Sequence, residues 1–99
     1  MFYQIGRIEP VPKHYKFIGT VEHFYPQVQA VTMQLAAGEL RRGDRIAFEL
    51  PVEFEEQDVK SLQVNNQQLE KAEVGMLAGI KTHLTKEQAK KGVRVFRIT

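Results

Sequence analysis

The sequence contains no cysteine, which excludes disulfide bonds, thiolate metal sites and cysteine nucleophiles together. No apolar run approaches the roughly 20 residues that a membrane-spanning helix requires. The first residues, MFYQIGRIEPVPKHYK, lack an uninterrupted apolar stretch and do not resemble a secretory signal. We therefore expect a cytoplasmic protein with no membrane partner.

Residues that carry catalysis or bind cofactors are also scarce. The three histidines, His14, His23 and His83, have no spacing typical of a metal site. Ser61 is the only serine and lies outside any G-x-S-x-G turn. The carboxylates at 55–58 are expected to repel one another and stay solvated. We expect no enzyme, no cofactor and no bound metal.

What the chain does contain is typical of one globular domain. Its 99 residues are 42% hydrophobic and 26% charged, enough apolar material for a core without metal or disulfide support. Pro10 and Pro12 each remove a backbone donor near the start. We therefore expect an N-terminal arm over residues 1–15 and a single domain over residues 16–99.

Short segments rich in β-branched and aromatic residues predict strands, and glycine or proline turns separate them. The segments are 16–24, 28–35, 45–50, 59–64, 69–74, 76–84 and 93–98. Thr85 and Gln88 fit a capping box and Gly92 fits a helix C-terminus, so one short helical turn is expected there. We predict an all-β fold, a small closed barrel of six or seven strands.

The apolar phase of these strands predicts the core. Its members are Val21, Ile46, Phe48, Val59, Leu62, Val64, Ile80, Val93 and Val95.

The charges are unevenly distributed although the net charge is only +2. Five acidic residues and no basic one lie between Glu49 and Asp58, whereas six basic residues follow Ile80 against Glu87 alone. The simplest interpretation is two solvated loops of opposite sign.

Several segments, taken in order, resemble the second domain of the translational GTPases, the β-barrel of elongation factor Tu. They are IGTVEHFYPQVQAVTMQL, LRRGDRI at 40–46, VKSLQV at 59–64, AEVGMLAGI at 72–80 and KKGVRVF at 90–96. The turn residues that match are Leu40, Gly43, Asp44, Ala72, Gly75, Gly79, Lys91 and Gly92. A similar accessory barrel occurs at the C-terminus of some collagenase-like peptidases, so the fold does not define a role.

The departures from this family are as informative as the matches. In elongation factor Tu a Glu, an Arg and an Asn of this barrel help to hold the aminoacyl end of tRNA. A gapless alignment places Gln63, Asn66 and Leu77 at those positions, so that pocket has lost its charges. No G-x-x-x-x-G-K-[ST] phosphate loop is present, which excludes GTP hydrolysis.

The resemblance implies a stand-alone, non-catalytic binding module related to translation, acting on RNA or on a ribosome-associated partner. The candidate nucleic-acid-binding residues flank two glycine turns and are Arg41, Arg42, Arg45, Lys90, Lys91 and Arg94. The candidates for base stacking are Tyr3, Tyr15, Phe24 and Tyr25.

The alternative is a protein–protein interaction or oligomerisation module with no nucleic-acid role. Such a module would use the N-terminal arm and the unpaired edges of the sheet. Steep salt dependence of RNA binding favours the first hypothesis, and a dimer that dissociates on deletion of the arm favours the second.

Overall fold

The structure is a computed structural model that describes residues 10–99. This range contains ten β-strands and no helix. The strands are β1 (Tyr15–Tyr25), β2 (Ala30–Leu35), β3 (Glu39–Arg41), β4 (Arg45–Glu49), β5 (Phe54–Asp58), β6 (Gln63–Val64), β7 (Gln67–Gln68), β8 (Lys71–Glu73), β9 (Leu77–Lys81) and β10 (Arg94–Ile98). The all-β prediction is confirmed, with more and shorter strands than the six or seven expected.

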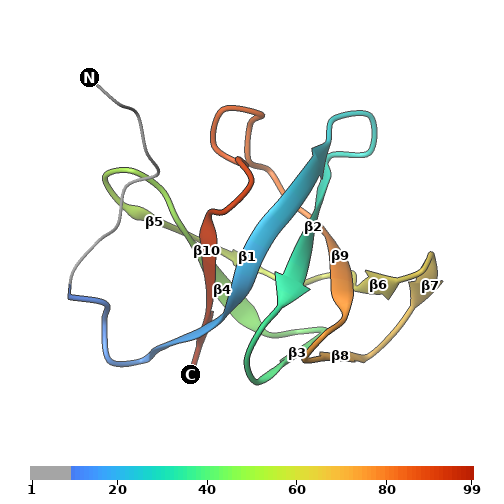
Figure 1. The fold of residues 1–99 in the computed structure, drawn as a ribbon, viewed down its shortest axis with the longest axis horizontal. Coiled ribbons are helices and arrows are strands. Elements are labelled where there is room, and N and C mark those ends of the chain that lie inside the picture. The colour runs from blue at the N-terminus through green and yellow to red at the C-terminus, as the bar shows by residue number, and fades with distance from the viewer. Residues whose placement is uncertain (1–9) are drawn as a thin grey trace.

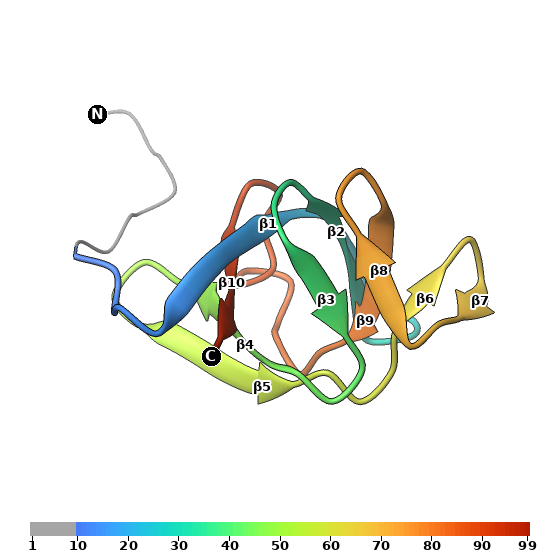
Figure 2. The ribbon, with the colours of Figure 1, turned by 90° about the horizontal axis from the view of Figure 1, so that it is seen from below.

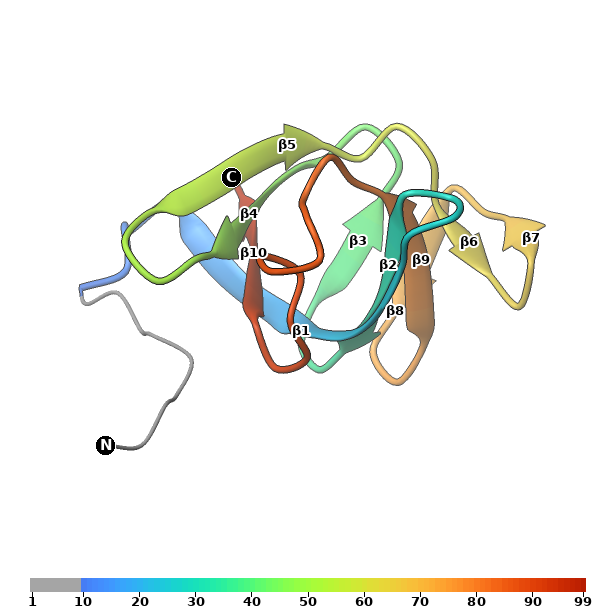
Figure 3. The same ribbon diagram turned by 90° about the horizontal axis from the view of Figure 1, so that it is seen from above.

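Eight strands form one antiparallel sheet in the order β5-β4-β10-β1-β2-β9-β6-β7. β3 and β8 pair separately as a two-stranded ribbon and lie side by side in Figure 2. The large sheet curves around the core, and the β6–β7 hairpin stands out from the body at one end (Figures 1 and 3). Within residues 10–99 no ladder joins β5 to β7, so backbone pairing does not close the sheet into a barrel.

Strand β1 is the centre of the sheet and pairs with both β10 and β2. Its register with β10 shifts between Phe17 and Gly19, a bulge that bends the strand. A Cβ atom at Gly19 would lie 2.1 Å from the backbone oxygen of Gln34. Only glycine therefore allows β2 to approach β1 at the bend.

The predicted core is confirmed. Eight of its nine members are at most 4% exposed, and Val64 packs partly buried against them. The core also contains residues from the turns between strands, such as Leu84 and Ala89.

The segment after β9 forms a turn rather than a helix. Thr85 and Gln88 make the expected reciprocal bonds: each backbone N–H donates to the other residue's side-chain oxygen. Two backbone bonds, from the Gln88 and Ala89 N–H groups to the Thr85 carbonyl, complete a single turn. Gly92 then has a φ of 95°, the left-handed geometry expected at the end of a helical turn.

The acidic segment expected to be a solvated loop is an ordered strand, β5, paired along its whole length with β4. The pattern Phe-Glu-Glu-Gln-Asp contains one apolar residue and gives no alternation to detect. The strand is ordered by its backbone pairing with β4, and Arg45 of β4 balances two of its carboxylates, at 3.2 Å from Glu56 and 2.9 Å from Asp58.

Tyr15, the last residue of the expected arm, is the first residue of β1. Residues 1–9 of the expected arm lie outside the described range, so only 10–14 can be placed. Within residues 10–99 there is no helix of the length and apolar character needed to span a membrane.

Candidate functional site

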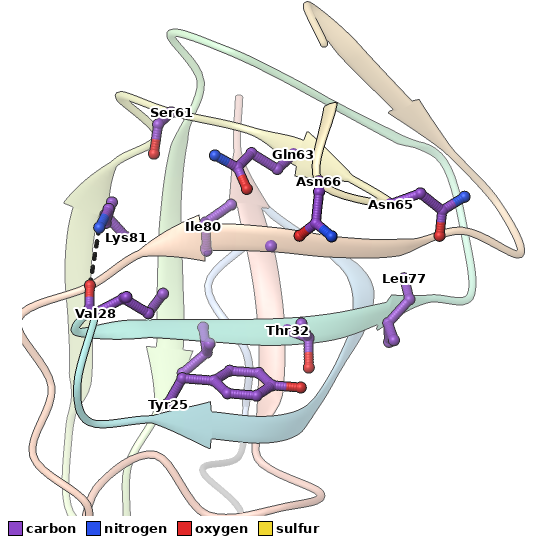
Figure 4. Close-up of a pocket in the computed structure, with 13 residues that line it drawn as sticks. Tyr25, Val28, Thr32, Ser61, Gln63, Asn65, Asn66, Leu77, Ile80 and Lys81 are labelled. Carbon is purple, nitrogen blue, oxygen red and sulfur yellow. Dashed lines mark hydrogen bonds between the residues drawn. The ribbon is translucent and has the colours of Figure 1, made fainter. Parts of the chain in front are cut away.

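A pocket of about 500 Å³ opens between strands β2 and β9 and the β6–β7 hairpin (Figure 4). Its lining comprises Tyr25, Val28, Ala30, Val31, Thr32, Ser61, Gln63, Asn65, Asn66, Leu77, Gly79, Ile80 and Lys81. A volume of this size is typical of small-molecule sites, roughly 300–1,000 Å³.

The period of two along β9 builds the floor of the pocket. Leu77, Gly79 and Lys81 share the face of the sheet opposite the core, since the intervening residues Ala78 and Ile80 are buried. Thr32 of β2 pairs directly with Gly79 and forms the adjacent part of the pocket floor. Gly79, the middle residue of these three along β9, has no side chain.

The hairpin forms the opposite wall. Asn65 and Asn66 have φ values of 53° and 65°, the two left-handed residues of a tight two-residue hairpin, which asparagine tolerates well. β6 meets β9 at one residue pair, Gln63 with Gly79, and the hairpin then diverges from the sheet. The amide side chains of Gln63, Asn65 and Asn66 therefore surround an opening rather than a paired strand (Figure 4).

The rim of the pocket is apolar and exposed. Tyr25 is 42% exposed, Val28 53% and Leu77 42%, three of the few large hydrophobic side chains exposed on the described surface. Exposed apolar groups beside polar ones are characteristic of interaction sites. Lys81 is the only formally charged side chain of the lining, and its ammonium donates to the Val28 carbonyl at 2.9 Å.

The pocket lining contains three groups able to take part in acid–base or nucleophilic chemistry, Tyr25, Ser61 and Lys81. Ser61 lines it, but the lining contains no histidine or carboxylate to act as its base. Across residues 10–99 no group of three or more metal-ligating side chains is assembled.

The two basic turns lie at opposite ends of the β4–β10 ladder. Arg45, the first residue of β4, pairs with Ile98, the last residue of β10, whereas Arg94 begins β10 beyond the Phe48–Val95 pair. In Figure 1 the turn before β10 is at the top of the view and the C-terminus at the bottom. The fold does not bring the six cations into one patch.

Each of these cations is engaged within the protein. Salt bridges join Arg41 to Glu39, Arg42 to Glu70, Arg45 to Glu56 and Asp58, Lys91 to Glu22, and Arg94 to Glu49. Lys90 also interacts with another group of the protein. Cations paired in this way compensate the protein's own carboxylates rather than forming a continuous basic surface.

The Arg94–Glu49 pair is buried and bidentate. Arg94 donates from Nε and Nη2 to the two carboxylate oxygens of Glu49, at 2.8 and 2.6 Å. The Glu49 side chain is 0% exposed and that of Arg94 17%, while the guanidinium lies 5.2 Å from the centre of the Phe96 ring. This geometry identifies a structural ion pair.

An aromatic cluster occupies the same region. The rings of Tyr15, Phe17, Phe54 and Phe96 make edge-to-face and tilted contacts, with centroids 4.8–6.1 Å apart. The Tyr15 hydroxyl donates to Glu56; burial and this hydrogen bond raise the pKa of Tyr15 to about 12. The same bond, followed by that from Arg45, lowers the pKa of Glu56.

The proposed base-stacking aromatics have separate surroundings. Tyr15 belongs to the cluster just described, Phe24 packs against the core, and Tyr25 lies at the rim of the pocket beside His23. Tyr3 lies outside the described residues.

None of the protein-family models matches the chain, and no curated protein does. Among solved structures, the chain is similar to the C-terminal domain of a U32 peptidase-like protein from Geobacillus thermoleovorans. The TM-score is 0.73 at 18% identity, covering 85% of this chain and 93% of that domain. The selenomethionine form of the same domain gives a TM-score of 0.72 at 19% identity, covering 82% and 98%. At these identities the likeness shows the fold alone.

The resemblance to the second domain of elongation factor Tu is therefore corrected. The two solved structures described above are of a domain from a U32 peptidase-like protein, and neither is a translational GTPase domain. An elongation-factor relationship and RNA binding have no support from these structures. The turn glycines and short strands that suggested the relationship are what any small curved sheet of this kind requires.

The pocket was only partly anticipated from the sequence. Gln63, Asn66 and Leu77, named through the alignment, do line one site. Gly79 was identified as a strand-curvature residue and Tyr25 as a stacking candidate, and neither was assigned to a pocket. The Asn65–Asn66 turn was visible, but which strand it faces depends on the tertiary fold.

Proposed function

We propose that this domain is a non-catalytic protein-interaction module whose binding site is the pocket between β2, β9 and the β6–β7 hairpin. The observation that carries the proposal is the exposed apolar rim of Tyr25, Val28 and Leu77 around a hollow lined by neutral amides. Exposed apolar side chains next to hydrogen-bonding groups are a combination that a protein partner recognises.

Two further observations support an accessory role. The pocket lining has no histidine or carboxylate, and charged side chains elsewhere, such as Arg41, Arg45 and Arg94, form ion pairs within the protein. The fold is similar to a C-terminal domain of a U32 peptidase-like protein. A small domain that supplies binding while chemistry takes place elsewhere fits both.

Two finer statements belong with this proposal. A cytoplasmic location is inferred from the absence of cysteine. A barrel that is open along one seam is inferred from the Gln57 side chain of β5, which donates to the Lys81 carbonyl and accepts from the Thr82 hydroxyl.

The test is selection of random peptides displayed on phage against the purified domain, followed by NMR mapping of those selected. We expect amide shifts to concentrate on Val28, Leu77 and Asn66. Val28→Asp should abolish binding, whereas Val74→Asp should not, although these valines are 53% and 57% exposed. Selected peptides that map elsewhere, or equal effects of both changes, contradict the proposal.

A further inference from the structure

Gly79 differs from the other glycines of the described chain. Gly38, Gly43, Gly75 and Gly92 have φ values between 65° and 99°, which disfavour any side chain. Gly19 has no room for a Cβ atom. Gly79 has neither constraint: its φ lies outside the left-handed range, and a Cβ atom there would find its nearest neighbour at 3.7 Å.

The missing side chain at Gly79 leaves a notch in the pocket floor. Three atoms line it: the Gln63 backbone oxygen, 3.7 Å from where a Cβ atom of residue 79 would lie, and the Gln63 Cβ and the Thr32 γ2-methyl group, each at 4.0 Å. Leu77 flanks it along β9. The two carbon atoms favour an aliphatic group, and the carbonyl oxygen gives an anionic group no compensating partner.

The rest of the lining specifies the charge and shape of the ligand. It has no carboxylate, and its one charged group is the Lys81 ammonium, so a cationic side chain would be repelled and unpaired. The amides of Gln63, Asn65 and Asn66 each offer donors and an acceptor, the same complement as a peptide group. Because β6 meets β9 at a single residue pair, the hairpin leaves an elongated opening beside β9.

We infer that the Gly79 notch is a subsite for one uncharged aliphatic side chain of an extended peptide, and that residue 79 sets the size of the side chain accepted. The inference rests on the proposed function, because it assigns the ligand class of the same pocket. The peptide main chain lies along the hairpin amides, and the Tyr25–Val28 rim covers its flank.

The experiment uses the whole chain, labelled with ¹⁵N, and blocked peptides of one sequence that differ only at the central position. The central residue is Leu, Gly or Lys. We expect the Leu peptide to shift the amides of Leu77 and Gly79, and the Gly peptide to bind about tenfold more weakly, since a hydrophobic subsite discriminates by that order. The Lys peptide should bind most weakly.

The diagnostic variant is Gly79→Ala, which fills the notch without a steric clash. It should weaken binding of the Leu peptide about tenfold and leave the affinity of the Gly peptide unchanged, so that the preference for Leu disappears. Val74→Ala, at an exposed position outside the pocket, should preserve the preference. Unchanged amide shifts at the core would show that Gly79→Ala is folded.

The failure modes are distinguishable. Peptides that bind in the pocket with equal affinity for Leu, Gly and Lys, or with a preference that Gly79→Ala leaves intact, overturn this inference and leave the proposed function standing. Peptides that shift no pocket resonance overturn both. A linear oligosaccharide that shifts these resonances when no peptide does also overturns both.

Discussion

The β4–β5–β10 side of the domain and the β2–β9–hairpin side treat polar groups in opposite ways. On the first side Arg94 and Glu49 form a buried bidentate pair, and Arg45 joins Glu56 and Asp58 across two strands. On the second side the lining has one charged residue, three amide side chains and an exposed apolar rim. The side richest in charge is thus the side whose groups already have partners.

The difference shows why charge was a poor guide to the site. A cation that is close to a carboxylate of its own chain stabilises the fold and has little attraction left for a ligand. Amides around an open hollow keep donors and acceptors available to an incoming molecule. In this domain the region that can bind is the neutral one.

The strongest test of the structural side is Glu49→Ala. Removing the carboxylate leaves the mostly buried Arg94 guanidinium without its bidentate partner, and we expect a loss of about 3–5 kcal/mol in the free energy of unfolding. Urea denaturation measures this loss of stability. Glu39→Ala, which breaks an exposed pair, is the control and should have little effect. Equal effects of the two changes would show that Glu49 has no special structural role.

The second test concerns the bulge in β1. In Gly19→Ala the new Cβ atom would lie 2.1 Å from the Gln34 backbone oxygen, so β1 and β2 must separate. We expect a loss of about 1–3 kcal/mol, or more, in the free energy of unfolding, measured by the same method. A wild-type denaturation midpoint would mean that the bulge relaxes at no cost.

The third test uses pH and the bond between Tyr15 and Glu56. The pKa of Tyr15 is raised from about 10 to about 12, so the unfolded chain releases the phenolic proton first and stability falls as pH rises through that window. The pKa of Glu56 is lowered, so its contribution is present above its ordinary pKa and is lost as pH falls through the folded value.

Tyr15→Phe should remove part of the loss of stability at alkaline pH. It should also raise the pKa of Glu56, because the hydrogen bond from the phenol is the largest cause of the lowered value. Carbon NMR of the Glu56 carboxyl group and urea unfolding between pH 9 and 12 measure the two effects, the latter across the window set by the Tyr15 values. Phe17→Leu alters the same aromatic cluster but keeps the phenol, so the lowered pKa of Glu56 and the loss of stability at alkaline pH should both remain. An unchanged Glu56 titration in Tyr15→Phe would contradict this account.

The smallest expected effect on stability is at the binding side. Gly79→Ala adds a Cβ atom with 3.7 Å of clearance, so the unfolding free energy should change by less than about 1 kcal/mol, toward greater stability. The contrast with Gly19→Ala, the same chemical change, separates a glycine the fold requires from one it does not. A large destabilisation by Gly79→Ala would mean that residue 79 is structural after all.

Local patterns predicted the strands with clear alternation and missed those without it. Ile46, Phe48, Ile80 and Val95 were assigned to the core correctly from the apolar phase of their strands. In β4 the other face is buried as well, at Ala47 and Glu49, which the phase did not predict. Strand β5 was missed because one apolar residue in five carries no period, and its order comes from pairing with β4. The Thr85–Gln88 box was predicted from spacing alone, since both partners are local.

The sequence by itself determined the all-β class, the core, the left-handed turn at Asn65–Asn66 and the scarcity of catalytic groups, because each depends on composition or on neighbours within a few residues. The tertiary structure decided which charges neutralise one another: Arg94 meets Glu49 across 45 positions, and Arg45 meets Glu56 across 11. It also decided that Gly79 lies opposite Thr32 and beneath the hairpin, because strand register, a long-range property, selects which side chains share a face.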